Sequence, residues 1–126
     1  MGLPLRKSKV EPPPSCPLMK CMAMLRGAWA PNVIWFLTGG PRRFGELRHD
    51  IPLISARVLS ARLRELEERG VVSRSVLATS PPSTEYALTE LGIELIPAIK
   101  ALVAVGNKLK ESNGMHKAGT RRLRAV

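Results

Sequence analysis

One predicted helix carries a row of side chains whose chemistry suits the edges of DNA bases. The row consists of Arg57, Ser60, Ala61 and Arg64. At about 100° per residue, it lies opposite an apolar stripe made of Leu59, Leu63 and Leu66. Arginine can donate two hydrogen bonds to O6 and N7 of guanine, serine can bond to a base or a phosphate, and alanine permits close approach. Glu65 and Glu68 lie further along near the same face, so we expect contact in the N-terminal half of the helix.

The same row also fits an amphipathic surface helix whose arginines are merely solvated, because basic stripes are common on protein surfaces. The neighbouring sequence favours DNA instead. A short helix and a turn at about residues 50–54 come before this helix, a β-hairpin follows it, and Arg42, Arg43 and Arg48 lie nearby. This order is typical of a winged helix-turn-helix.

The hydrophobic pattern between the two ends of the chain predicts five helices and one hairpin. The helices are expected at about residues 16–27, 30–37, 44–51, 55–70 and 89–110, and the hairpin strands at residues 71–77 and 84–88. Ser55 is a good N-cap, and Gly70 is a natural residue just past a helix end. Pro97 removes the backbone hydrogen bond to the Ile93 carbonyl, which predicts a kink or break in the last helix. The expected fold class is mainly α with a small β-hairpin, of the α+β type.

Length and charge restrict the classes of protein. The chain has 126 residues, enough for one domain, and a formal net charge of +10. The charge is +3 over residues 1–20, +4 over residues 42–64, −4 over residues 65–99 and +6 over residues 100–126. Such a balance indicates an acidic partner, of which nucleic acid is the commonest for a small domain. We expect the tails to add salt-sensitive attraction that is independent of DNA sequence.

The ends of the chain and its cysteines exclude other classes. We expect a flexible, Pro-rich basic arm over residues 1–15, a folded domain over residues 16–110 and a disordered basic tail over residues 111–126. The longest uncharged run, Gly27 to Pro41, is shorter than the ~18 residues of a membrane helix, and the N-terminus has no apolar core of signal-peptide length. Cys16 and Cys21 cannot build a disulfide framework, which favours a reducing compartment. A cytoplasmic protein without a membrane partner is expected.

Six apolar residues of the last predicted helix follow the alternating spacing of a coiled-coil seam. They are Leu91, Leu95, Ala98, Leu102, Val105 and Leu109. A helix packed on its own domain is the alternative, and it also accounts for Ile93, Ile96, Ile99 and Val103. Apolar residues occupy too much of the circumference for a single partner, so we expect both contacts.

Cys16 has features of a reactive thiol, because it lies at a predicted helix N-terminus, where the helix dipole favours the thiolate, with Lys20 one turn further on. A structural role is the alternative, since such a cysteine reacts only when it is exposed in electropositive surroundings. Cys21 is expected to be a small buried hydrophobe. His49 and His116 lie far apart, and the sequence contains no metal-ligand cluster or phosphate-binding loop. We expect neither an enzyme nor a metal or cofactor site.

A series of short motifs lies in register with one known family. It comprises Cys16-Pro17, Gly27, Trp29, the run from Gly40 to Leu47, Ser55 with Leu59, the run from Arg62 to Glu67, Gly70-Val71-Val72, and Pro81-Pro82 before the run from Glu85 to Thr89. On these motifs the chain resembles the HxlR-type winged helix-turn-helix transcriptional regulators of bacteria from about Cys16 to Leu109. Two positions depart from the pattern: Ala28 stands where a lysine is common, and Ser83 where a basic residue usually follows the paired prolines.

The resemblance implies a homodimer on operator DNA, with the helix from Ser55 as recognition helix, the hairpin as wing, and the first and last helices as dimerisation helices. The implied dimer residues are Leu18, Met22, Leu91, Leu95, Ala98, Leu102, Val105 and Leu109. The residues expected at DNA are Arg42, Arg43, Arg48, Ser55, Arg57, Ser60, Ala61, Arg64 and Arg74. Arg74, on the first wing strand, can replace the basic residue missing at Ser83. Some regulators of this family sense oxidants through a cysteine at the place of Cys16.

Three functions therefore stay open. The leading one is a sequence-specific regulator that binds double-stranded DNA as a homodimer on an approximate inverted repeat, because two recognition helices about 34 Å apart meet successive major grooves. The second is a redox, electrophile or ligand sensor that acts through Cys16 and the dimer helices, with an oxidant or small molecule as effector and DNA binding as readout. The third is a non-specific nucleic-acid-binding protein driven by its basic tails.

Overall fold

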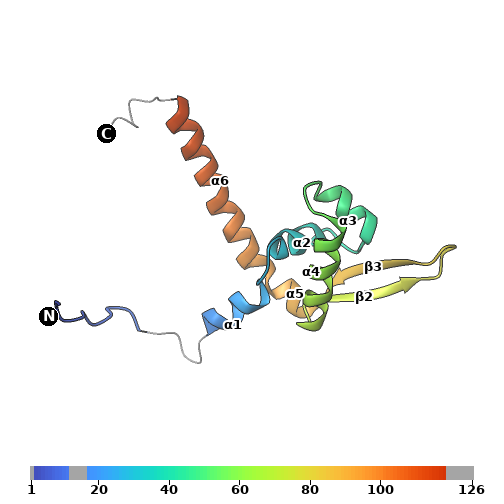
Figure 1. Ribbon diagram of the computed structural model, residues 1–126, viewed down its shortest axis with the longest axis horizontal. Coiled ribbons are helices and arrows are strands. Elements are labelled where there is room, and N and C mark those ends of the chain that lie inside the picture. The colour runs from blue at the N-terminus through green and yellow to red at the C-terminus, as the bar shows by residue number, and fades with distance from the viewer. Residues whose placement is uncertain (1, 12–16, 119–126) are drawn as a thin grey trace.

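The computed structural model of the chain describes residues 2–11 and 17–118, with side chains as far as residue 112. Its elements, in chain order, are α1 (Pro17–Met24), α2 (Ala30–Leu37), β1 (Arg42–Arg43), α3 (Phe44–Asp50), α4 (Ala56–Glu68), β2 (Val72–Leu77), β3 (Ser83–Leu88), α5 (Glu90–Glu94) and α6 (Ile96–Ala118). Helices α2, α3 and α4 gather beside one end of the sheet, from which the β2–β3 hairpin extends, while α6 projects away from the body (Figure 1). The mainly helical fold with a small antiparallel sheet is confirmed.

A single hydrophobic core joins α2, α3, α4, the sheet and the start of α6. Its buried members are Ala30, Val33, Ile34, Leu37, Leu47, Ile51, Ile54, Leu59, Leu63, Leu66, Val71, Val72, Tyr86, Leu95 and Ile99. The apolar stripe predicted for α4 is confirmed, because Leu59, Leu63 and Leu66 are each no more than 1% exposed. Burying a leucine side chain contributes roughly 1.5–3 kcal/mol relative to leaving it in water, so this stripe determines which face of α4 points outward.

Both ends of α4 have the local chemistry that the sequence predicts. The Ser55 side chain accepts a hydrogen bond from the Val58 N–H at 3.1 Å, which satisfies one of the unpaired donors of the first turn. At the other end, Gly70 adopts a φ of 77°, and the Val71 N–H donates to the Leu66 carbonyl at 2.9 Å. This left-handed turn directs the chain from α4 into β2.

The sheet has three strands rather than the two of the predicted hairpin. Strand β1 pairs antiparallel with β3, and Arg42 lies opposite Tyr86 and Arg43 opposite Glu85, so the strand order is β1-β3-β2. A strand of two residues has no hydrophobic periodicity, so only the tertiary pairing reveals it. The consequence is that the chain entering α3 is held to the wing.

The last predicted helix is broken where Pro97 requires it. Helix α5 ends at Glu94 and α6 begins at Ile96, with the proline in the first turn of α6. Helix α6 continues past Lys110 to Ala118, whereas the sequence predicts a disordered tail from residue 111. Residues 119–126 lie outside the described residues. Residues 2–11 of the expected arm form neither helix nor strand, and residues 12–16 are not described.

Thr89 and Gly92 fasten α5 to the first strand of the wing. The Thr89 N–H donates to the Val71 carbonyl at 3.0 Å, and the Thr89 Oγ1 accepts from the Gly92 N–H at 3.2 Å. A Cβ atom on Gly92 would lie inside van der Waals contact with the Val71 carbonyl oxygen. This position therefore requires glycine for close approach of the two backbones.

We predict that Gly92→Ala lowers the free energy of unfolding by about 1–3 kcal/mol, because the added methyl group forces α5 away from β2. Urea denaturation followed by circular dichroism measures the change. Gly45→Ala is the matched control, since a Cβ atom there has no neighbour within 4 Å. Equal unfolding midpoints for the two variants would contradict the close packing at Gly92.

Candidate DNA-binding surface

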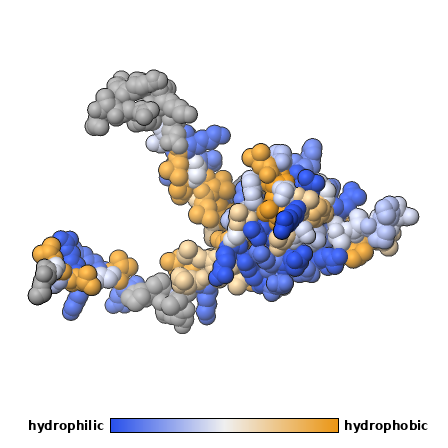
Figure 2. All heavy atoms as spheres, viewed as in Figure 1, coloured by the Kyte–Doolittle hydropathy of each residue, from blue (hydrophilic) through white to orange (hydrophobic). Residues whose placement is uncertain are grey.

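The outward face of α4 presents the row of side chains that the sequence singles out. Arg57 and Arg64 are exposed, while Ser60 and Ala61 are partly buried. Hydrophilic residues cover the body around α4, whereas hydrophobic residues gather along α1 and the beginning of α6 (Figure 2). The molecule therefore separates a polar, basic surface from an apolar one.

Ion pairing divides the arginines around α3, α4 and the wing into two groups. Within the described part of the chain, the arginines that form ion pairs are Arg42, Arg43, Arg62 and Arg69. Those without an ion pair among the described residues are Arg48, Arg57, Arg64 and Arg74, all of them exposed. An arginine that already has a carboxylate partner must lose it before it binds a phosphate or a base, so the second group is the one available to DNA.

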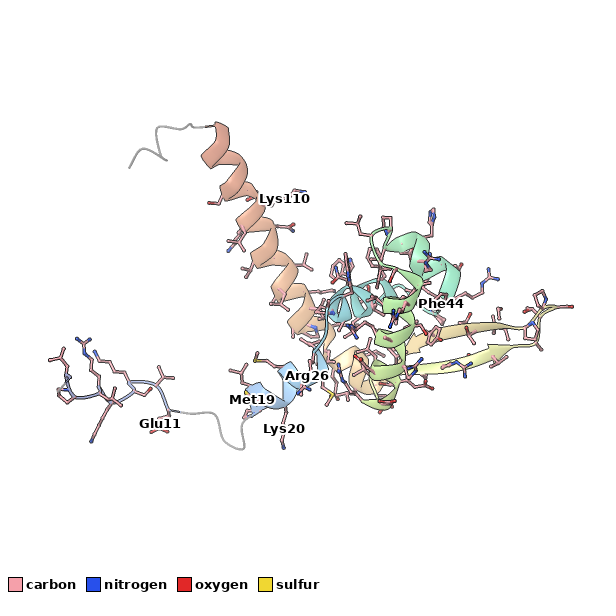
Figure 3. The ribbon with its side chains drawn as sticks, viewed as in Figure 1. Glu11, Met19, Lys20, Arg26, Phe44 and Lys110 are labelled. Carbon is pink, nitrogen blue, oxygen red and sulfur yellow. The ribbon has the colours of Figure 1, made fainter. Side chains whose placement is uncertain are left out.

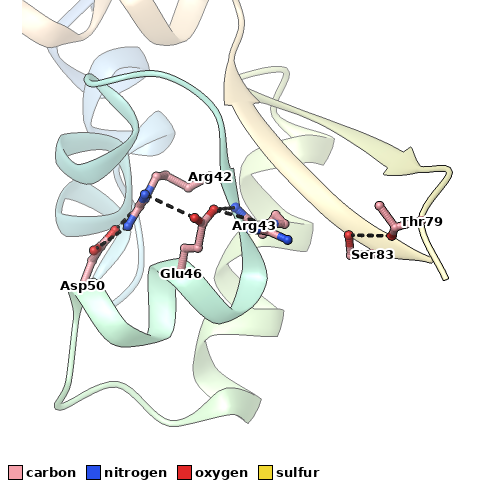
Figure 4. Close-up of polar contacts among 6 residues, drawn as sticks. All are labelled: Arg42, Arg43, Glu46, Asp50, Thr79 and Ser83. Atoms are coloured by element: carbon pink, nitrogen blue, oxygen red, sulfur yellow. Dashed lines mark hydrogen bonds and ion pairs between the residues drawn. The ribbon is translucent and has the colours of Figure 1, made fainter. Parts of the chain in front are cut away.

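Arg42, expected at DNA, instead ties β1 to the end of α3. Its Nε donates to Asp50 Oδ2 at 2.9 Å and its Nη2 to Asp50 Oδ1 at 2.8 Å, a bidentate pair (Figure 4). Its Nη1 lies 3.5 Å from Glu46 Oε2. The hydrogen bond with Asp50 raises the pKa of Arg42 further above its ordinary value. We therefore reassign Arg42 from DNA contact to positioning of α3.

Glu46 completes this arrangement at the start of α3. Its Oε1 accepts a hydrogen bond from the Arg43 backbone N–H at 2.8 Å. That bond, followed by attraction to Arg42 and Arg43, lowers the pKa of Glu46 below its ordinary value despite some desolvation. The Arg43 side chain stays 53% exposed, with its Nε 3.6 Å from Glu46, so its guanidinium still faces solvent.

Arg62 and Arg69 hold the segment between α1 and α2, residues 25–29, against the side of α4; we call this segment the α1–α2 link. Arg62 Nε donates to the Ala28 carbonyl at 2.8 Å, and Arg69 Nη1 donates to the Arg26 carbonyl at 2.9 Å. Glu65 accepts from Arg62 at 3.0 Å and lies 3.6 Å from Arg69. No pattern in the sequence indicates the contacts of these two arginines with Ala28 and Arg26, because the acceptors are backbone carbonyls, which every residue has.

Gly27 is the residue that admits the Arg62 side chain to this link. Its φ of 104° is one that side chains rarely adopt, and a Cβ atom there would lie 2.8 Å from Arg62 Nε. Arg62 belongs to the same α4 helix as Arg57 and Arg64, but its side chain is engaged inside the protein. The link therefore sets the orientation of α4 without taking part in its outward face.

Arg74 lies on the wing strand nearest to α4. It is exposed and pairs in register with Tyr86 of β3, which is 9% exposed and belongs to the core. At the wing tip, Thr79 Oγ1 and Ser83 Oγ lie 3.3 Å apart (Figure 4). Ser83 leaves the tip without a charge at the position where a basic residue was expected, so Arg74 is the basic residue that the wing offers.

The apolar surface consists of residues on α1 and on α6. The break between α5 and α6 at Leu95 interrupts the predicted coiled-coil seam. Leu95 is 7% exposed and packs in the core of its own domain, so its assignment to a dimer interface is wrong. The break also separates Leu91 on α5 from the rest of the row. The residues that remain exposed on α1 and α6 are Leu18, Met22, Leu102, Val105 and Leu109. Ala98 is partly buried at the base of α6.

Helix α6 also packs against its own domain, through Ile99. Ile99 is 2% exposed and joins the core, whereas Leu102 is 55% exposed. Pro31, Met22 and Leu102 line an apolar hollow between α1, α2 and α6, and the side chains of α1 and α6 extend into solvent around it (Figure 3). The double role expected for the last helix is confirmed for its contact with its own domain, and an unpartnered apolar surface remains.

The cysteines and the other candidate functional groups lie away from the outward face of α4 or outside the described residues. Cys16 lies outside the described residues, and Cys21 is partly buried against the core. Within residues 2–11 and 17–112, no group of three or more His, Cys, Asp or Glu residues is arranged to hold a metal ion. No helix that the structure describes is both long and apolar enough to cross a membrane.

The chain is similar to known proteins in both sequence and structure. A profile of the HxlR-like helix-turn-helix family matches residues 24–113. The chain is 38% identical over 96 residues to the HTH-type transcriptional regulator YdeP of Bacillus subtilis strain 168, covering 76% of this chain and 75% of that protein. Among solved structures, it is similar to the redox regulator HypR in its oxidised form, with a TM-score of 0.69 and 35% identity over 74% of this chain and 96% of that chain. It is also similar to the reduced form of the transcriptional regulator YodB from B. subtilis, with a TM-score of 0.63 and 38% identity over 71% of this chain and 88% of that chain.

We predict that Glu46→Gln reduces stability at pH 7 and makes it less sensitive to acid. The folded-state pKa of Glu46 is lowered, so its contribution is complete above the ordinary value of 4.5 and is lost as the pH falls through the folded-state pKa. Urea midpoints at pH 7 and pH 3 measure this, with Glu68→Gln on exposed α4 surface as the control for loss of charge. A gap between wild type and Glu46→Gln that is as wide at pH 3 as at pH 7 would refute the assignment.

Proposed function

The chain belongs to the HxlR-like helix-turn-helix family, and from this premise we propose that it regulates transcription by binding a specific DNA sequence as a homodimer. The proposal depends above all on one observation: the outward face of α4 presents Arg57 in its first turn, without an ion pair among the described residues, next to Ser60 and Ala61. Recognition helices of this motif read bases with their N-terminal residues. Arg57 is therefore the residue we assign to guanine.

Phosphate contacts on either side of α4 would position the helix without reading sequence. Arg43 and Arg48 on the α3 side are exposed and face solvent. The Ser55 Oγ accepts from the Val58 N–H as the cap of α4, and its O–H can still donate to a phosphate oxygen. Arg42 is left out of this set because Asp50 holds the Nε–Nη2 edge of its guanidinium and Glu46 lies 3.5 Å from its Nη1.

The proposed dimer forms through the apolar surface of α1 and α6. Its residues are Leu18, Met22, Ala98, Leu102, Val105 and Leu109. A contiguous row of exposed leucine, valine and methionine side chains is unusual on a monomer and typical of a protein–protein interface. A two-fold dimer sets two recognition helices about 34 Å apart, which fits an approximate inverted repeat. Such a regulator acts where the DNA is, so we propose a cytoplasmic site of action.

A second candidate function is redox sensing through Cys16. The observation in its favour is the likeness to HypR, a redox regulator solved in its oxidised form. Cys16 comes directly before α1, whose exposed Leu18 and Met22 belong to the proposed interface. Oxidation of a thiol at this place would act on the dimer, and through the dimer on the spacing of the two recognition helices. DNA binding would then be the readout of the thiol's state.

We predict that selection of DNA from a random pool by the purified protein yields an inverted repeat with half-sites about ten base pairs apart. Arg57→Ala should weaken binding to the selected site by ~1–3 kcal/mol and relax the preference at one position of each half-site. Lys20→Ala, which removes one positive charge from α1, is the control and should leave the preference unchanged. Selection of unrelated sequences would refute sequence-specific binding, and a single half-site would refute the dimer.

The redox candidate predicts that diamide changes the affinity of the wild-type protein for the selected site and leaves Cys16→Ser unaffected. Gel-shift titrations with and without diamide, followed by reduction with dithiothreitol, measure the effect and its reversibility. Cys21→Ser is the matched control, because Cys21 is partly buried on α1. An identical response of Cys16→Ser and wild type would eliminate Cys16 as the sensor.

A further inference from the structure

A polar hollow lies between the outward face of α4 and the root of the wing. Its lining residues are Ser60, Arg64, Glu67, Arg74 and Tyr86. Two guanidinium groups, one from the helix and one from strand β2, thus border the same space. In the sequence, Arg64 belongs to the row on α4 and Arg74 to the first wing strand, ten residues further on, and no local pattern relates the two.

Helix geometry assigns Arg64 to the wing side of α4. Ser60, Arg64 and Glu67 succeed one another at intervals of four and three residues, so they form one line along the edge of the helix that faces the sheet. Arg57 lies two turns earlier on nearly the same line, about 20° from Arg64 at about 100° per residue, and it does not border the hollow, while Ala61 lies further round the outward face. Arg64 also lies about 10 Å further along the helix axis than Arg57, at a rise of about 1.5 Å per residue.

Strand register directs Arg74 toward the same space. Arg74 lies directly opposite Tyr86 in the antiparallel pair of β2 and β3. Directly opposite residues project from the same face of a sheet. Tyr86 is 9% exposed and packs into the core beneath the helices, so the face it shares with Arg74 is the one covered by α3 and α4.

Neither arginine of the hollow has an ion pair among the described residues, although Glu67 lines the same space. Arg62 and Arg69, on or next to the same helix, differ from these two arginines, because Glu65 and backbone carbonyls bind their guanidinium groups. Two unpaired guanidinium groups that border one solvent-filled hollow form a site for an anion with several oxygen acceptors.

We propose that this hollow holds one phosphate of the DNA backbone, bound jointly by Arg64 and Arg74. The proposal rests on the proposed function, in which α4 enters the major groove. With Arg57 at the bases, a phosphate at the edge of that groove meets the wing side of α4, where both arginines point. Arg64 is then a positioning contact that carries no sequence information, and Arg57 alone of the two outward-facing arginines of α4 reads a base.

Glu67 has a defined part in the same site. Its carboxylate borders the hollow and repels a phosphate, so it weakens binding to every DNA sequence alike. Glu67→Gln keeps the shape of the side chain and removes the charge. It should therefore raise the affinity for specific and unrelated DNA by the same factor.

The test measures binding by fluorescence anisotropy to the selected site and to an unrelated duplex of equal length over a range of salt concentrations. Arg64→Ala and Arg74→Ala should each weaken binding to both duplexes, roughly tenfold, because each removes a charge-assisted hydrogen bond. The slope of log affinity against log salt should fall by about one in the double variant and by less than one in either single variant, since the two arginines share one phosphate. Lys20→Ala is the control for loss of charge.

A second arm locates the phosphate with a series of operators, each with one phosphate neutralised as a methylphosphonate. At one phosphate of each half-site, neutralisation should weaken binding of the wild type, weaken binding of Arg64→Ala and of Arg74→Ala less, and have no further effect on the double variant. Responses of the two arginines at different phosphates would overturn the proposal. So would a change in the sequence selected by Arg64→Ala, which would make Arg64 a base-reading residue while leaving the proposed function intact. If the wild type selects no sequence at all, the proposed function itself fails.

Discussion

The burial of three leucines on α4 is the constraint on which the rest of the structure depends. Leu59, Leu63 and Leu66 are almost completely removed from water, so the rotation of this helix about its axis has only one favourable value. Every other property of the face toward solvent follows from that value. A rotation that moved Arg57 away from its outward position would expose part of the stripe, and the loss of apolar burial is larger than the gain from any single surface contact of an arginine. The core thus positions the residues that we propose for DNA binding.

Carboxylates and backbone carbonyls bind some of the arginines inside the domain and leave others exposed without an ion pair among the described residues. Asp50 engages Arg42, and Glu65 stands between Arg62 and Arg69. These contacts join α3 to β1 and the α1–α2 link to α4, so the elements around α4 are fastened by arginine, the same residue type that we propose for binding DNA. The arginines without such partners among the described residues all face solvent. A count of positive charge along the chain therefore overstates the charge that DNA encounters, because part of it is neutralised inside the protein.

Helices α5 and α6 are joined to the rest of the domain by closely packed contacts. Thr89 bonds to Val71 at the start of β2, Gly92 allows the two backbones to approach, and the chain then turns at Leu95 into α6. Ile99 anchors the base of α6 in the core, while the residues beyond it leave the domain. In the proposed dimer, a change in how two copies of α6 meet would be transmitted through this connection to the wing and to α4, since packed elements shift as units rather than deform continuously.

The sequence by itself determined the order of the main helices, the caps of α4 at Ser55 and Gly70, the buried leucine stripe and the break before Pro97, because each of these depends on local propensity or on a repeat that few residues establish. Local patterns also identified Arg57 and Arg64 as outward-facing. Only the tertiary structure decided the rest. It paired the two-residue strand β1 with β3, withdrew Leu95 into the core, engaged Arg42 with Asp50, and brought Arg64 and Arg74 to one hollow. These are contacts between segments whose separation in the chain has no fixed period, so they depend on how the helices and the sheet pack together.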